Sequence, residues 1–153
     1  MGLVSTFKPV KWTGRAHRLA MHARRLSDSI VLHHPEYVIM ESPAYGALKF
    51  PHTTVQLGEL RGVILATLWD VGISVFDVAP KAVKKFATGN GNAKKDDMID
   101  SAVAMNIPVK NSDEADAWWL WVIGMSKWDD GVIGVQMTDE RQAVLAAIDW
   151  TPA

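Results

Sequence analysis

Three acidic residues in this chain are spaced so that they could hold a metal ion. Asp113 and Asp116 are three residues apart, so a helix over this segment puts both carboxylates on one face of one turn. Glu41 directly follows an apolar run at 37–40 that is typical of a strand buried on both faces of a sheet. Because ligands bind at the carboxyl ends of strands in open α/β sheets, the sequence predicts a candidate site at this sheet edge.

Each of these acids also has a simpler interpretation. Asp113 and Asp116 would stabilise a helix dipole from its first turn, and Glu41 could be a solvated or salt-bridged strand end. Glu114 is expected to cap the helix or to face solvent. The letters Asp-Glu-Ala-Asp at 113–116 also match a helicase box. That function is excluded because the apolar run follows the acids and no GxxxxGK[ST] loop exists in the chain.

A basic segment between residues 80 and 95 is the second feature with chemical potential. It contains five lysines, no acids and a glycine-rich loop at 89–92. The lysines are Lys81, Lys84, Lys85, Lys94 and Lys95. Glycines let a backbone approach phosphates and lysines neutralise them, so the segment favours nucleic-acid binding over the alternative of a solvated loop.

Composition is that of an ordinary globular protein. With 153 residues and 48% hydrophobic content, a single domain over 1–153 is expected. No cysteine is present, which fits a reducing, cytoplasmic setting, and no apolar run is long enough for a membrane span. The net charge of −1 conceals 13 basic against 6 acidic residues in 1–95 and 3 against 11 in 96–153. This asymmetry suits a phosphate-binding surface beside a cation-binding pocket, although two solvated faces would explain it too.

The elements that must position these residues alternate between strands and helices. Strands are expected at 2–8, 37–40 and 73–78, with a small hairpin at 129–138. Helices are expected at 13–32, 53–71, 80–86, 94–105, from 113 onward, and at 139–150. The order predicts an α/β fold with covered sheet faces, although three clear strands are few for such a sheet. Trp118, Trp119 and Trp121 are expected in the core.

Taken in order, these segments resemble the RuvC family of Holliday-junction resolvases, within the ribonuclease H-like nucleases. The resemblance runs from about Tyr37 to Met125. It rests on VIME at 38–41, LGELRGV at 57–63, VFDVAPKAVK at 75–84, GNGNAKK at 89–95 and DEADA at 113–117. The last four are similar to the family's LGxxRG, VFEYAPxxVK, GxGxAxK and DxxDA stretches. The ESP segment at 41–43 and the compact size resemble phage or actinobacterial versions of the family.

The resemblance implies a fold, a reaction and roles for particular residues. The fold would be a ribonuclease H-like mixed sheet flanked by helices. Glu41, Asp113 and Asp116 match three of the family's four metal-binding acids, and Lys84 and Lys95 match basic positions that contact DNA near the scissile phosphate. The implied activity is Mg²⁺- or Mn²⁺-dependent two-metal hydrolysis of branched DNA by a homodimer. The alternative is a branched-DNA-binding protein without catalysis.

The chain departs from the family pattern at its N-terminus. The family's fourth acid is an Asp on the first, central strand, and the segment at 2–8 resembles the family's third strand instead. The first strands are therefore expected to be missing, which favours a start site placed too late over an inactive remnant. Asp28, on the first expected helix, is a poor substitute for the fourth acid. Translation of the upstream DNA in frame is expected to reveal a strand that carries an Asp.

Overall fold

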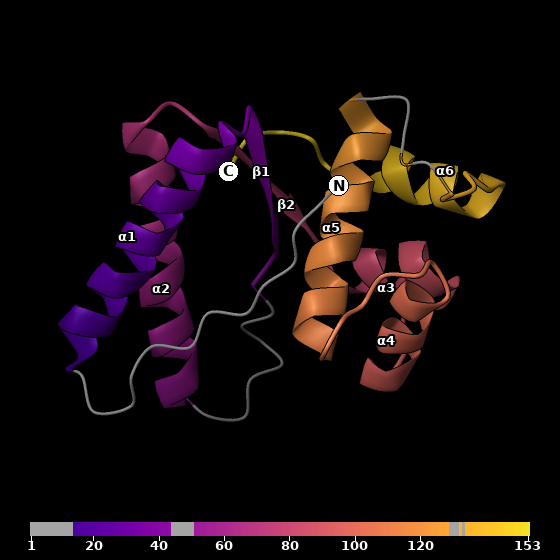
Figure 1. The fold of residues 1–153 in the computed structure, drawn as a ribbon, viewed down its shortest axis with the longest axis horizontal. Coiled ribbons are helices and arrows are strands. Elements are labelled where there is room, and N and C mark those ends of the chain that lie inside the picture. Colours follow the sequence, from indigo (N-terminus) through magenta and orange to yellow (C-terminus); the bar gives the residue numbers. More distant parts are fainter. Residues whose placement is uncertain (1–13, 44–50, 129–131, 133) are drawn as a thin grey trace. The chain divides into compact units, whose positions relative to one another are not determined.

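A computed structural model describes residues 14–43, 51–128, 132 and 134–153 (Figure 1). The elements are α1 (Arg15–His33), β1 (Tyr37–Glu41), α2 (Pro51–Asp70), β2 (Ser74–Val78), α3 (Pro80–Thr88), α4 (Lys95–Val103), α5 (Ser112–Trp128) and α6 (Asp139–Ala147). Their order and types match the sequence prediction for the described residues of 14–43 and 51–128. The strand predicted at 2–8 lies outside the described residues. Within 129–138, the described residues form a turn and no strand, so the expected hairpin is not found there.

The two described strands pair in parallel to form a small sheet. The backbone N–H of Ser42 donates to the carbonyl of Val78 at 2.8 Å and continues the pairing past Glu41. The α/β class is thus confirmed. The expected complete burial of Tyr37–Met40 is wrong, because these residues are only half-buried. In the described sheet β1 has β2 as its single hydrogen-bonded neighbour, and a strand at the edge of a sheet is less covered than a central one.

The chain divides into two compact units. One contains Ile39–Ser42 and Asp77–Thr151, and therefore α3, α4, α5 and α6. Its core is a continuous cluster of buried apolar side chains, with Trp119, Phe86 and Met98 among the largest. The other unit contains α1, α2 and the first parts of both strands. All of the predicted site residues lie in the first unit.

The core of the first unit is built on one face of α5. Trp118 and Trp119 are buried as predicted, together with Val122 and Ile123 on the next turn. The prediction that Trp121 is also in the core is wrong, because 36% of this residue is exposed. Residues two positions apart on a helix differ by about 200° in direction, so Trp121 points away from the face that Trp119 buries.

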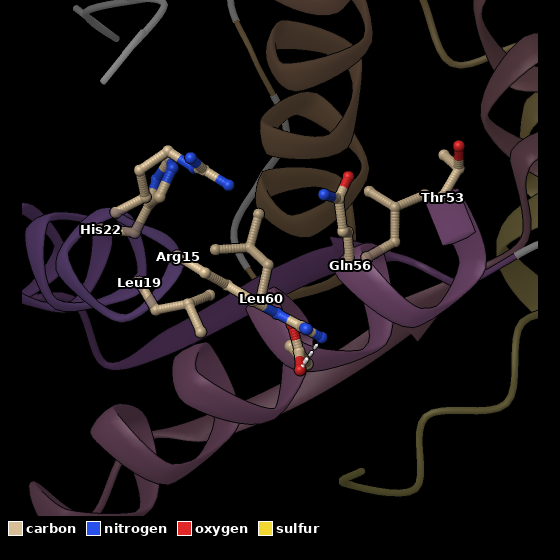
Figure 2. Close-up of a pocket in the computed structure, with 9 residues that line it drawn as sticks. Arg15, Leu19, His22, Thr53, Gln56 and Leu60 are labelled. Atoms are coloured by element: carbon tan, nitrogen blue, oxygen red, sulfur yellow. Dashed lines mark hydrogen bonds and ion pairs between the residues drawn. The ribbon is translucent and has the colours of Figure 1, made fainter. Parts of the chain in front are cut away.

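In the second unit, α1 packs along α2 and leaves a hollow of about 220 Å³ between them (Figure 2). Arg15 of α1 forms an ion pair with Glu59 of α2 at this hollow. On α1, Leu19 and Leu26 are half-buried, and no residue of this helix is fully buried. No helix in the described part of the chain is long and apolar enough to cross a membrane.

The last helix is shorter than the sequence predicts. α6 ends at Ala147, because Ile148 takes an extended backbone with φ −76° and ψ 132°. The indole Nε1 of Trp150 then donates to the carbonyl of Leu145 at 3.1 Å. This bond satisfies a carbonyl that a longer helix would have paired internally, so a Trp expected inside the helix instead caps its end.

Candidate functional site

The three predicted acids come from the ends of two elements in the same unit. Glu41 is the last residue of β1, and Asp113 and Asp116 lie in the first two turns of α5. Asp116 is half-buried, whereas Glu41 and Asp113 are exposed. We refer to these three residues as the acidic site.

A capping arrangement fixes the start of α5. The side-chain oxygen Oδ1 of Asn111 accepts from the N–H of Glu114 at 3.0 Å. The Oε2 atom of Glu114 accepts from the N–H of Lys110 at 2.9 Å. Glu114 therefore caps the helix, as predicted, but it does not face solvent, since only 6% of it is exposed. These reciprocal bonds resemble a capping box and set the direction in which Asp113 and Asp116 project.

Electrostatic coupling shows that the acids and two lysines share one neighbourhood. Partial burial raises the pKa of Glu41, the charges of Asp116 and Asp113 raise it further, and the charge of Lys84 opposes the increase. Glu41 still reaches solvent, so its desolvation is incomplete.

Asp116 responds to a similar set of neighbours. Partial burial raises its pKa, Asp113 adds to the increase, and the charges of Lys84 and Lys95 oppose it. The fold thus brings together five residues that the sequence singled out separately.

All three side chains of the acidic site are carboxylates, and carboxylate oxygens are ligands that a hard divalent cation prefers. The number of protein ligands for one ion is small, because within the described residues no three His, Asp or Glu side chains approach closely enough to hold one ion. Mg²⁺ is often held by one or two protein carboxylates, with water and substrate phosphates completing its shell. Glu41 and Asp116 suit that mode of binding, because the charge of Asp116 opposes ionisation of Glu41 and a cation would relieve this repulsion.

The five predicted lysines lie on α3 and at the start of α4, which pack against each other (Figure 1). Four of them are exposed and Lys84 is half-buried. We call these residues the basic surface: Lys81, Lys84, Lys85, Lys94 and Lys95. Its half-buried member, Lys84, is also the lysine whose charge acts on both Glu41 and Asp116, so the basic surface adjoins the acidic site.

The loop between α3 and α4 is held tightly against α3. Gly89 has φ +78°, a left-handed conformation that ends the helix at low cost only for glycine. A Cβ atom at Gly91 would lie 3.2 Å from the carbonyl oxygen of Lys81. Asn90 Oδ1 accepts from the N–H of Asn92 at 2.9 Å. The glycines thus allow the loop to pack closely against α3.

Arg141 is a residue near the basic surface that the sequence did not single out. Its guanidinium donates to two backbone carbonyls at the end of α3, those of Phe86 and Ala87. No sequence pattern marks it, because its partners are backbone carbonyls more than fifty residues away.

The raised pKa of Glu41 predicts a pH-dependent gain in stability when its charge is removed. A carboxyl whose pKa is raised on folding contributes stability below its unfolded value, here 4.5, and loses it as the pH rises through the folded value. Glu41→Gln should therefore unfold at a higher temperature than the unmodified chain at pH 7, by less than about 4 °C because water screens an exposed group. The difference should shrink toward pH 4.

Thermal unfolding followed by circular dichroism at both pH values tests this expectation. Glu36→Gln, the same change at an exposed residue just before β1, serves as the control. A gain at pH 7 that equals the gain at pH 4, or one that the control reproduces, would contradict repulsion within the acidic site.

The small parallel sheet with its flanking helices belongs to the ribonuclease H-like fold. Two solved structures share this fold with the chain. T. thermophilus RuvC in complex with a Holliday junction substrate has a TM-score of 0.62 at 20% identity, over 74% of this chain and 69% of that one. A second Thermus thermophilus RuvC structure has a TM-score of 0.61 at 17% identity, over 79% and 75%.

Sequence comparison identifies the family within that class. The family model described as Crossover junction endodeoxyribonuclease RuvC matches residues 3–123. The chain therefore belongs to the RuvC family, which confirms the resemblance found in the sequence.

Curated relatives carry the same description. The protein from Anaeromyxobacter sp. (strain K) is 39% identical over 113 residues, which is 73% of this chain and 60% of the relative. Those from Cytophaga hutchinsonii and Rickettsia conorii are each 33% identical, over 86 and 104 residues. These matches cover 56% and 66% of this chain, and 42% and 65% of the two relatives. The matches thus cover between 42% and 65% of the length of these three relatives, and α6 lies beyond the family match.

Proposed function

We propose that the protein containing this chain is a metal-dependent, structure-specific endonuclease that resolves Holliday junctions or other branched DNA. The observation that carries this proposal is the placement of acids from the end of β1 and the start of α5 beside lysines of α3 and α4, near enough for their charges to act on Glu41 and Asp116. Carboxylates that repel one another gain a partner when a cation binds, and lysines beside them can hold the phosphate that is cleaved. The relatives' description as crossover junction endodeoxyribonucleases supports the substrate class.

In this proposal, Glu41, Asp113 and Asp116 are the residues that would hold Mg²⁺ or Mn²⁺. The bound ions would supply the two-metal chemistry of phosphodiester hydrolysis, which lowers the pKa of a water and stabilises the leaving oxygen. The chain itself places the carboxylates at the end of β1 and at the capped start of α5. Lys84 lies on the boundary between the acidic site and the basic surface, so it would orient the scissile phosphate.

The basic surface would bind the DNA backbone without reading sequence. Phosphate contacts position a duplex and carry no sequence information directly. One structural relative, the T. thermophilus RuvC, is in complex with a Holliday junction substrate, and this supports a four-way junction as the bound form of DNA.

We further propose that the protein acts as a homodimer, with one active site for each strand to be cut. Two-fold symmetry of the protein would match that of a four-way junction. The second unit exposes large apolar side chains on both of its helices, with Leu32 of α1 at 72% and Val55 of α2 at 53%. Light scattering of the purified protein measures its oligomeric state directly, and a monomer at micromolar concentration would contradict the proposed homodimer.

A cleavage assay tests the proposed activity. The full-length protein is incubated with a labelled four-way junction and with linear duplex of the same sequence. We expect paired nicks in the junction with MgCl₂ or MnCl₂, none with EDTA, and little cleavage of the linear duplex. Absence of junction cleavage under every metal condition would overturn the proposal.

Replacing two lysines of the basic surface should weaken DNA binding in a salt-dependent manner. Each phosphate contact contributes about −0.9 to the slope of log affinity against log salt concentration. Lys84→Ala with Lys95→Ala should therefore reduce the magnitude of that slope by about two. Fluorescence anisotropy of a labelled junction between low and high NaCl provides the measurement, and Lys110→Ala, an exposed lysine before α5, is the matched control. An unchanged slope would remove these lysines from the DNA interface.

The second candidate function is that of a branched-DNA-binding protein without catalysis. The observation in its favour is that no three acids among the described residues are close enough together to hold one ion. This function requires the lysines and not the acids. If Glu41→Gln changes metal binding or cleavage, the binding-only function is contradicted.

A further inference from the structure

Arg141 connects α6 to the end of α3. Its Nε atom donates to the carbonyl of Phe86 at 2.9 Å, and its Nη2 atom donates to the carbonyl of Ala87 at 3.4 Å. Both carbonyls lie in the last turn of α3, where helix carbonyls lack amide partners within the helix. A cation at this position also stabilises the negative end of the helix dipole.

The same guanidinium is held from its other sides. Its Nη1 atom donates to the carbonyl of Gln136 at 2.6 Å, just before α6 begins. The carbon Cζ lies 5.5 Å from the ring centroid of Phe86 and 5.1 Å from that of Trp119. These contacts use the planar fork of arginine, which a lysine ammonium cannot reproduce.

The end of α3 in turn sets the loop that leads to Lys94 and Lys95. Thr88 Oγ1 donates to the carbonyl of Lys84 at 2.9 Å and accepts from the N–H of Asn90 at 3.1 Å. The carbonyl of Asn90 accepts from the N–H of Ala93 at 3.0 Å. Each turn of the loop is thus bonded to the one before it, beginning at the helix turn that Arg141 holds.

We propose that Arg141 is a positioning residue for DNA binding: by fixing the end of α3 it fixes the loop that presents Lys94 and Lys95 to phosphates. That DNA is the ligand of this loop rests on the proposed function, whereas the effect of Arg141 on the loop does not. Because α6 lies beyond residues 3–123, this role belongs to a part of the chain outside the family match.

Two variants and one control separate positioning from general stability. Arg141→Met removes the charge and the donors, and Arg141→Lys keeps the charge but loses the fork. Val144→Ala trims a buried residue of the same helix, 6% exposed, and so weakens the core without touching the end of α3 through a hydrogen bond. All are compared at a temperature where circular dichroism shows each to be folded.

The first readout is junction binding across a range of NaCl concentrations. In Arg141→Met the slope of log affinity against log salt concentration should fall in magnitude by about two, because Lys94 and Lys95 would no longer contact DNA phosphates. Affinity at low salt should fall at least about tenfold, with Arg141→Lys intermediate. Val144→Ala should keep the slope of the unmodified chain. Equal slopes for Arg141→Met and Val144→Ala would overturn the proposal.

The second readout is amide hydrogen exchange, which needs no DNA. Both Arg141 variants should accelerate exchange at residues 89–95 selectively, whereas Val144→Ala should accelerate it throughout the core. If the unmodified chain fails to bind any DNA, the proposed function is wrong. The exchange comparison then still decides whether Arg141 positions the loop, and unchanged exchange at 89–95 would refute it.

Discussion

Asp116→Asn should reduce Mg²⁺-dependent cleavage of a four-way junction by at least about 10³-fold, equivalent to a loss of about 4 kcal/mol of transition-state stabilisation. The change is isosteric, and Asp116 lies in the second turn of a helix whose start is capped independently, so the fold should remain intact. The variant removes one of two carboxylates that both feel the charge of Lys84, and a hard cation held by so few ligands should lose most of its affinity.

Binding without metal should respond in the opposite direction. The carboxylate of Asp116 repels DNA phosphates that approach the basic surface. Removing its charge lowers this repulsion, so junction affinity in EDTA should stay the same or increase. Cleavage rates with metal and fluorescence anisotropy of a labelled junction without metal, both measured on the full-length protein, provide the two readouts. Asp100→Asn, the same substitution at an exposed acid of α4, is the control and should cleave normally. Cleavage by Asp116→Asn within a few-fold of the unmodified rate would exclude this acid from metal binding.

The acids of the site could be found in the sequence because each marks the end of an element. An apolar run that stops at Glu41 and a capping residue before Asp113 both have local signatures that need no knowledge of the rest of the fold. The proximity of Glu41 to Asp116 has no such signature. It follows from how β1 and α5 pack, which is decided by contacts between residues distant in sequence.

The two clearest errors of prediction from the sequence have one cause. The apolar run at 117–123 has no polar residue to reveal which side of the helix faces the core, so the pattern places Trp121 inside with its neighbours. Tyr37–Met40 is likewise apolar throughout, and a continuous run does not show how many strands will cover it. The sequence shows which side of a helix or strand is buried only where polar residues alternate with apolar ones.

Trp119→Ala should lower the free energy of unfolding by about 3–5 kcal/mol, the usual cost of removing a large buried aromatic side chain. Trp119 has no exposed surface and packs edge-on against Phe86 and Trp118, at centroid distances of 6.0 and 4.6 Å. Its Nε1 atom donates to Ser101 Oγ at 2.8 Å, so the variant also leaves a half-buried hydroxyl without that partner. The loss is a large fraction of the roughly 5–15 kcal/mol that stabilises a typical domain.

Trp121→Ala makes the same substitution two residues later on the same helix and isolates burial as the cause. With 36% of Trp121 exposed, its removal should cost clearly less, about 1 kcal/mol. Urea denaturation followed by far-ultraviolet circular dichroism measures both values. Equal losses would mean that α5 buries a different face from the one described. That result would also undermine the acidic site, because the face of α5 packed on the core determines where Asp116 points.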